Sequence, residues 1–185
     1  GSKIKFYCFE PSKINFYFLE KNLKKFQNIK IFNYGLSDCV EKKILSFPAW
    51  ENLSKDKNTG LLSLHGNTDI NSETVNLITL DNFIKKNKIE NKIFIKIDTE
   101  GYEFNVLNGA KNFLSNNSDI VIQLEVNFKI EDNIKNNNIK KSINLLKQLN
   151  YSPFLYENLY IKNISNENLE EIIKKKLFLK LYFKK

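Results

Sequence analysis

The chain has 185 residues, a length typical of one domain and sufficient to bury a core without disulfides or a structural metal. Its 42% apolar and 27% charged residues exclude a disordered chain, and no apolar run approaches the roughly 18 residues of a membrane span. Two cysteines, Cys8 and Cys39, are too few for a disulfide scaffold, and no secretory leader is visible. We therefore expect a cytoplasmic protein with no transmembrane segment.

The net charge of +8 comes from 29 lysines, with no arginine, against 21 acidic residues. Lysine, asparagine, isoleucine and phenylalanine are abundant, which is the composition that an AT-rich coding sequence imposes whatever the function. Proteins that read nucleic acid rely on arginine, because its planar group fits guanine edges and phosphate. We therefore expect no nucleic acid as a partner.

The first part of the chain predicts a parallel strand, helix and strand. A β-branched and aromatic run over 3–9 ends at Glu10, since the proline that follows cannot continue a central strand. Ser12 is suited to cap a helix over 12–26, and the run 29–34 predicts the second strand. This order and spacing are typical of a parallel α/β unit.

The remaining elements follow from the apolar pattern, with a long polar loop expected over 48–71. The expected strands lie at 40–47, 74–80, 92–98, 119–126 and 177–183, the helices at 81–86, 103–114, 139–149 and 167–176, and a hairpin over 151–163 turning at 157–158. The alternation of the last strand favours a sheet edge over the alternative, a basic segment lying on an anionic membrane surface.

Acidic residues stand at or near the C-terminal ends of the expected parallel strands. Glu10, Asp98 with Glu100, and Glu125 hold such positions. Ligands of open α/β sheets bind outside the carboxyl ends of the strands, so these carboxylates mark the candidate site. Glu10 is placed to accept hydrogen bonds from the hydroxyls of a ribose, the alternative being a charge at a solvated turn or helix entry.

The stretch 96–103 is the most distinctive, because it puts one lysine and three carboxylates at the end of a buried strand. Such a density favours shifted pKa values and proton or metal chemistry. The alternative is helix capping, with Asp98 or Thr99 as the N-cap.

Three side chains outside this stretch could have either a functional or a structural role. His65, the only histidine, could act as a base from the polar loop or be an idle loop residue. Trp50 could stack on a sugar or cover an edge of the core. Cys8, within an apolar strand, is expected to be a small buried hydrophobe.

Several segments, in order, resemble the FkbM family of S-adenosylmethionine-dependent methyltransferases over roughly residues 3–127. The first is YCFEPS (7–12) with LEKN (19–22), which is similar to the family's aFEP…L..N, and the second is YGLSD (34–38), which is similar to n.AlsD with Gly35 where alanine is usual. The third is TLD (79–81) and IKIDTEGYEF (95–104) with VL (106–107) and GA (109–110), which is similar to tLD…lKiDvEGaE..vL.Ga. Glu125 matches a later acidic position of the family.

The resemblance implies a Rossmann-like α/β sheet, mostly parallel with an antiparallel C-terminal hairpin or edge, in a single methyltransferase-like domain over 1–185. It implies binding of S-adenosylmethionine and methyl transfer, most often to a hydroxyl of a sugar or glycan precursor. Glu10 would hold the cofactor ribose, and Gly35, Leu36 and Ser37 would line the adenine pocket.

The resemblance also places Asp98 beside the cofactor, where it would orient or deprotonate the acceptor with support from Lys96 and Glu100. Glu125 and His65 are expected on the acceptor side. A hydroxyl must lose its proton as it attacks, which calls for a base. Asp98 or Glu100 could serve if burial raises its pKa, or the two could hold a divalent cation. The sequence does not distinguish between these roles, and we assign no metal ligands.

The family's first strand and its glycine-rich D.GAn.G turn have no counterpart before Lys3. That strand would lie between those at 3–9 and 92–98, so its absence leaves each without one ladder partner. We expect one of three solutions: residues preceding Gly1 supply the strand, another chain or a second copy in a homo-oligomer supplies it, or the sheet has become a noncatalytic interaction module that does not bind the cofactor.

Overall fold

The computed structural model describes residues 4–46, 64, 72–90, 92–127, 137–157, 160–165, 169, 172 and 178–185. The chain divides into two compact units, Gly1–Thr79 and Leu80–Lys185. The single methyltransferase-like domain over 1–185 stays a prediction. Of the predicted polar loop only Leu64 is described, so His65 and Trp50 lie outside the described residues.

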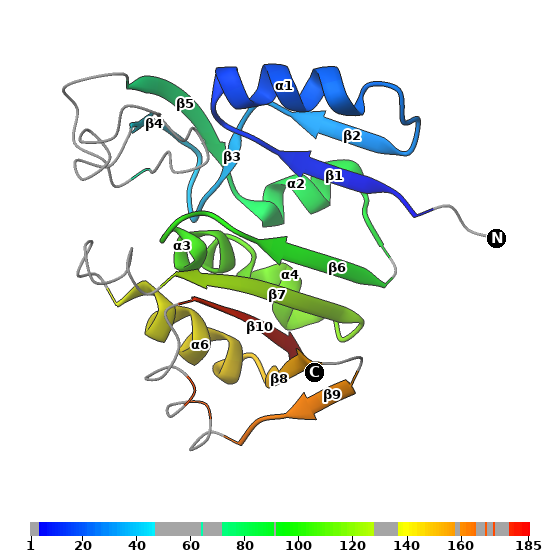
Figure 1. Cartoon of the computed structure of the whole chain (residues 1–185), viewed down its shortest axis with the longest axis vertical. Coiled ribbons are helices and arrows are strands. Elements are labelled where there is room, and N and C mark those ends of the chain that lie inside the picture. Colours follow the sequence, from blue (N-terminus) through cyan, green and yellow to red (C-terminus); the bar gives the residue numbers. More distant parts are fainter. Residues whose placement is uncertain are drawn as a thin grey trace. The chain divides into compact units, whose positions relative to one another are not determined.

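In the first unit, a strand, a helix and a parallel strand follow one another as predicted (Figure 1). β1 (Phe6–Phe9) pairs in parallel with β2 (Ile29–Phe32). α1 (Lys13–Leu23) connects them and begins after Ser12, whose hydroxyl accepts a hydrogen bond from the Asn15 N–H group at 3.4 Å. The predicted N-cap is therefore confirmed, and the helix ends about one turn earlier than the predicted residue 26.

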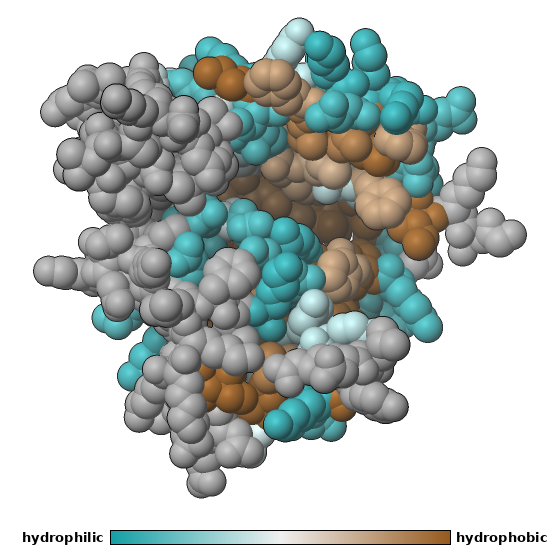
Figure 2. Space-filling view, viewed as in Figure 1, coloured by the Kyte–Doolittle hydropathy of each residue, from teal (hydrophilic) through white to brown (hydrophobic). Residues whose placement is uncertain are grey.

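A second sheet completes the first unit. β5 (Glu73–Ile78) lies in the middle, parallel to β3 (Gly35–Leu36) and antiparallel to β4 (Glu41–Leu45). Leu45, Val75 and Leu77 form a buried cluster, against which Leu64 packs. This cluster is small, and α1 buries none of its residues. Figure 2 accordingly shows apolar side chains on the surface over α1 and β1. Phe6, Ile14 and Phe18 are exposed.

The second unit contains a five-stranded sheet in the order β6-β7-β10-β8-β9. The strands are β6 (Ile93–Ile97), β7 (Ile120–Asn127), β8 (Ser152–Glu157), β9 (Tyr160–Asn163) and β10 (Phe178–Lys184). β6 and β7 are parallel, and the other neighbours are antiparallel. The predicted hairpin is confirmed, since β8 and β9 pair at one edge of this sheet.

The predicted edge position of the terminal strand is wrong. β10 lies between β7 and β8 and pairs with both. Leu181 and Phe183 are fully buried while Lys180 and Lys184 are exposed. An antiparallel strand in the interior of a sheet alternates in this way when one face is covered, so alternation alone does not distinguish an edge strand from an interior one.

Four helices of the second unit are described in full. They are α2 (Leu80–Asn87), α3 (Glu103–Asn108), α4 (Lys111–Asn116) and α6 (Asn138–Gln148). The predicted helix over 103–114 is thus two helices, and the reason lies in α2. The Asp81 carboxylate accepts the N–H groups of Asn112 at 3.1 Å and Phe113 at 2.8 Å, so it caps a new helix there. The predicted helix over 167–176 lies mostly outside the described residues.

The pairings make the fold α/β with mixed sheets. Three strand pairings are parallel and four are antiparallel among the described residues, so a mostly parallel sheet is not confirmed. Within the same residues β1 pairs only with β2, and β6 only with β7, which leaves one edge of each without a ladder partner. No described helix has the length and apolar character needed to cross a membrane.

Candidate functional site

Glu10 stands directly after β1, where the sequence predicts a cofactor contact. Its N–H group donates to the Phe32 carbonyl at 3.1 Å, and its Oε1 atom accepts the Ser12 N–H group at 2.9 Å. Asn33 donates from Nδ2 to the carbonyls of Glu10 at 3.0 Å and Pro11 at 3.1 Å. Burial raises the pKa of Glu10, and the nearby charge of Glu73 adds to this. A half-buried carboxylate is therefore fixed at the end of the strand.

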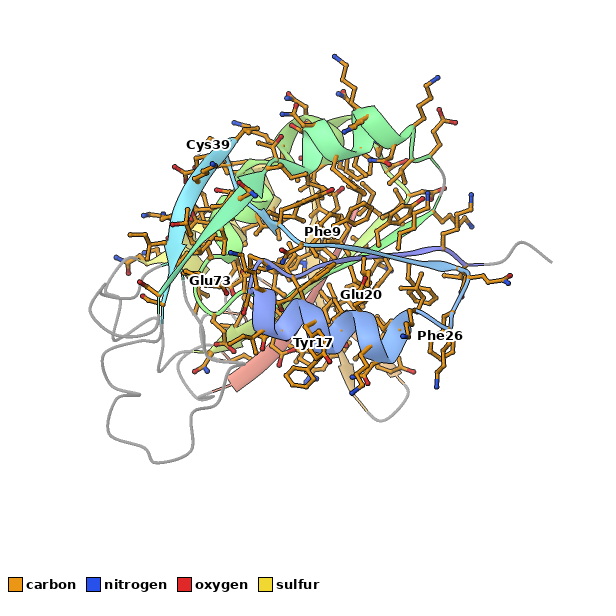
Figure 3. The ribbon with its side chains drawn as sticks, turned by 90° about the horizontal axis from the view of Figure 1, so that it is seen from above. Phe9, Tyr17, Glu20, Phe26, Cys39 and Glu73 are labelled. Carbon is orange, nitrogen blue, oxygen red and sulfur yellow. The ribbon has the colours of Figure 1, made fainter. Side chains whose placement is uncertain are left out.

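Glu73 is a neighbour that the sequence did not reveal. It lies near the first turn of α1 (Figure 3), and its two carboxylate oxygens accept the Lys13 N–H group at 3.1 and 3.2 Å. A carboxylate at this position stabilises the positive end of the helix dipole. Because 60 residues separate Glu73 from Lys13, no local pattern could have predicted the contact.

Gly35 and Leu36 form β3 and Ser37 follows it, in the same unit as Glu10. A Cβ atom at Gly35 would lie 2.7 Å from Cδ2 of Leu77 and 3.4 Å from Cβ of Pro11, which explains why glycine stands where alanine is usual. Leu36 pairs with Ile78. Ser37 is fully buried, and its N–H group donates to the Ile78 carbonyl at 2.8 Å. The turn after β1 and the start of β3 are thus in contact.

The second cluster stands at the ends of β6 and β7. Lys96 Nζ lies 2.8 Å from Oδ2 of Asp98 and 3.3 Å from Oε2 of Glu125. The hydrogen bond to Asp98 raises the pKa of Lys96. The Oε2 atom of Glu125 is buried and has no hydrogen bond, so it meets Lys96 as an ion pair only. One lysine therefore holds two carboxylates from adjacent strands.

Glu100 belongs to the same cluster, and its pKa is raised. Burial raises its pKa to about 7, and the charges of Asp98, Glu103 and Glu125 contribute. Its backbone is left-handed, with φ of 49°, and the next residue, Gly101, has φ of 92°. Two consecutive left-handed residues turn the chain sharply from β6 toward α3, and only the second is a glycine.

Glu103 holds this turn from inside. Its side chain is 5% exposed, and Oε1 accepts the Thr99 N–H group at 3.1 Å, the Thr99 hydroxyl at 3.2 Å and the Gly101 N–H group at 3.2 Å. The N-cap position of α3 is Tyr102, which makes no side-chain capping bond. The interpretation of Asp98 or Thr99 as the N-cap is therefore wrong.

Asn138 holds the turn from another element. It lies at the start of α6, is 4% exposed, and donates from Nδ2 to the Gly101 carbonyl at 2.7 Å. The sequence carried no signal for Asn138, since 37 residues separate the partners. For Glu103 a signal was present, namely a glutamate two residues after a turn glycine.

The structure thus brings Lys96, Asp98, Glu100 and Glu125 together in the second unit and Glu10, Gly35, Leu36 and Ser37 in the first. Among the residues that are described, no group of three or more histidine, cysteine or acidic side chains is arranged to hold a metal. Asp98 and Glu125 hold an ammonium group instead. Cys8, expected to be buried, is half-buried in β1, and burial raises the pKa of its thiol.

Comparison with known proteins agrees with the sequence motifs. The methyltransferase FkbM domain model matches residues 1–153. The crystal structure of methyltransferase FkbM from Methylobacillus flagellatus KT is similar in fold, with a TM-score of 0.50 and 12% identity over 98% of this chain and 36% of that one. This chain therefore spans about a third of the length of that protein. Comparison with curated proteins gives no match. The family model covers most of the chain, which therefore belongs to the FkbM methyltransferase domain family.

Proposed function

We propose that the chain acts in an S-adenosylmethionine-dependent O-methyltransferase, on a hydroxyl group of a sugar or glycan precursor. The observation that carries this proposal is the cluster at the ends of β6 and β7, where Lys96 binds Asp98 and Glu100 has a pKa of about 7. Carboxylates with such shifted pKa values are suited to proton transfer at neutral pH. The cluster lies within the residues that the family model matches.

The first unit fits the adenosine part of the cofactor. The half-buried Glu10 carboxylate would accept the ribose hydroxyls, and Leu36 with Gly35 and Ser37 would face the adenine. The contact between Pro11 and Gly35 keeps these two segments adjacent. When bound, S-adenosylmethionine supplies a methyl group on a sulfonium, so the protein has mainly to position the acceptor in line with it.

In this proposal the cluster in the second unit binds the acceptor. Asp98, held by Lys96 at 2.8 Å, would accept a hydrogen bond from the acceptor hydroxyl. As the acceptor oxygen bonds to the methyl group and the bond from that group to the cofactor sulfur breaks, the hydroxyl proton would pass to the Glu100 carboxylate. The Glu100 pKa of about 7 would allow it to be unprotonated before the step and protonated after it. Glu125 contributes by fixing Lys96 from the second strand. His65 remains an acceptor-side proposal from the sequence.

Transfer of a labelled methyl group from S-adenosylmethionine to candidate sugars tests the proposal. Asp98→Asn should abolish turnover and leave the cofactor affinity within a few-fold, whereas Glu10→Ala should mainly weaken cofactor binding. An equal loss of cofactor affinity in both variants would refute this division of roles.

The second candidate is an interaction module that does not bind the cofactor. One observation favours it, since the Glu10 carboxylate already accepts the Ser12 N–H group. The two candidates differ in one property, since only the methyltransferase binds S-adenosylhomocysteine.

A further inference from the structure

A concavity of about 630 Å³ lies at the opposite ends of β1 and β2 from those that carry Glu10 and Asn33. The described residues that line it come from the strands and from the turn after α1: Lys5, Tyr7, Lys25, Phe26, Gln27, Asn28 and Lys30. Its size falls in the range of small-molecule sites, roughly 300 to 1,000 Å³. About 16 Å of extended chain separates Lys5 from Glu10, so this is not the methyltransferase site.

The pairing of the strands explains why these side chains converge. Tyr7 lies opposite Lys30 in the parallel ladder, so the two share a face of the sheet. Lys5 lies directly before β1 and lines the same concavity. Asn28 donates from Nδ2 to the Ile4 carbonyl at 3.0 Å, which ties the turn after α1 to the start of β1.

The turn adds a third lysine and an exposed aromatic ring. Lys25 Nζ lies 5.2 Å from the centre of the Phe26 ring. Phe26 is 45% exposed and lies beyond the C-terminal end of α1 (Figure 3). Covering such a large apolar ring with a flat ligand removes its surface from water, which lowers the free energy and favours binding.

The charge of the concavity has one sign. Three lysines line it, and no carboxylate is among the described residues of the lining. Like charges around a concave surface repel one another and together attract anions. Lysine binds phosphate as a point charge, which needs no planar guanidinium geometry, so the absence of arginine does not weaken this argument.

We propose that this concavity binds a nucleoside phosphate. The ammonium groups of Lys5, Lys25 and Lys30 contact the phosphate oxygens, and the rings of Tyr7 and Phe26 contact the base. Stacking of a base on an aromatic side chain strengthens such binding and tolerates any base, because every base has a flat π-face. The inference does not depend on the proposed methyl transfer.

Calorimetric titration of the full chain with uridine diphosphate and with inorganic pyrophosphate tests this proposal. Uridine diphosphate lacks adenosine, so it does not report on the proposed cofactor site. The combined variant Lys5→Ala, Lys25→Ala and Lys30→Ala should weaken binding of both probes by about tenfold or more. Phe26→Ala should weaken uridine diphosphate by about tenfold and leave pyrophosphate within about twofold.

The matched control is Lys21→Ala, Lys42→Ala and Lys86→Ala, which removes the same charge from exposed positions outside the concavity. Circular dichroism checks that each variant folds. The proposal is wrong if uridine diphosphate does not bind at millimolar concentration, or if the control weakens binding as much as the lining variant does. If Phe26→Ala weakens both probes equally, or weakens neither, the proposed contact between the base and Phe26 is wrong.

Discussion

Lys96 Nζ lies 2.8 Å from Oδ2 of Asp98, two residues further along the chain, and the same ammonium group reaches Glu125 on the neighbouring strand. The lysine thereby pairs with two carboxylates that parallel pairing of β6 and β7 brings to one edge. Its replacement should disturb the proposed chemistry more than the fold.

The first prediction concerns Lys96→Met. The Lys96 side chain is 48% exposed, and exposed ion pairs contribute about 0 to 1 kcal/mol, so the free energy of unfolding should change by no more than that. Turnover should fall by about tenfold or more, because Asp98 loses the ammonium group that orients it. Urea unfolding and the methyl-transfer assay measure the two effects. Lys92→Met, at an exposed position before β6, should change neither.

The second prediction concerns pH and Glu100. If its carboxylate accepts the proton, turnover should rise with pH through about 7 and then level off, while Glu100→Gln should be slow and nearly independent of pH across that range. Asp98, Glu103 and Glu125 also act on this titration, so the midpoint belongs to the cluster. A wild-type profile that is flat through neutral pH would contradict the role.

The same shift predicts a change in stability with pH. The folded-state pKa of Glu100 is raised from 4.5, so its contribution to stability is complete below about 4.5 and is lost as the pH rises through about 7. The Glu100→Gln side chain cannot ionise. The melting temperature of this variant, relative to that of the wild type, should therefore increase from acid to mildly alkaline pH. Thermal unfolding across this range checks the direction, and a constant difference would contradict it.

The third prediction concerns Asn138→Ala. Loss of the 2.7 Å bond leaves the buried Gly101 carbonyl without this donor, which should cost about 1 to 3 kcal/mol of unfolding free energy. Chemical denaturation measures it. Asn144→Ala, exposed on the same helix, is the matched control and should be neutral or slightly stabilising, because alanine favours helix. Equal effects of both changes would show that the bond to Gly101 contributes nothing specific.

The fourth prediction concerns Gly35→Ala, which introduces the residue usual in the resembling family segment. The new Cβ atom would lie 2.7 Å from Cδ2 of the buried Leu77, so the change should destabilise by about 1 to 3 kcal/mol. Leu77→Val removes the clashing atom. Gly35→Ala should therefore cost less in that background, and a double-mutant cycle measures the coupling. An additive cycle would rule out the clash.

Local patterns predicted much of the fold. The proline after Glu10 ended β1, Ser12 began α1, and the apolar run before Asp98 formed β6, because each signal acts on its own few residues. The rule that parallel strands end at one edge also predicted that Asp98 and Glu125 would come together, and both now contact Lys96.

Long-range contacts explain what the patterns missed. Asp81 begins α4 from 31 residues away, which divides a helix that looks continuous in sequence. Asn138 and Glu73 form hydrogen bonds with residues 37 and 60 positions away in the sequence, and the residues around them give no sign of these contacts. The position of β10 between β7 and β8 depends on pairing partners, which an alternating pattern does not specify.

The central claim, that the acidic end of β1 holds an adenosyl cofactor, is tested most directly by calorimetric titration with S-adenosylhomocysteine. Micromolar binding is expected, and Glu10→Ala should weaken it by about tenfold or more, whereas Glu20→Ala, exposed on α1, should leave it unchanged. Absence of binding at millimolar concentration, or equal binding by the wild type and Glu10→Ala, would contradict the claim.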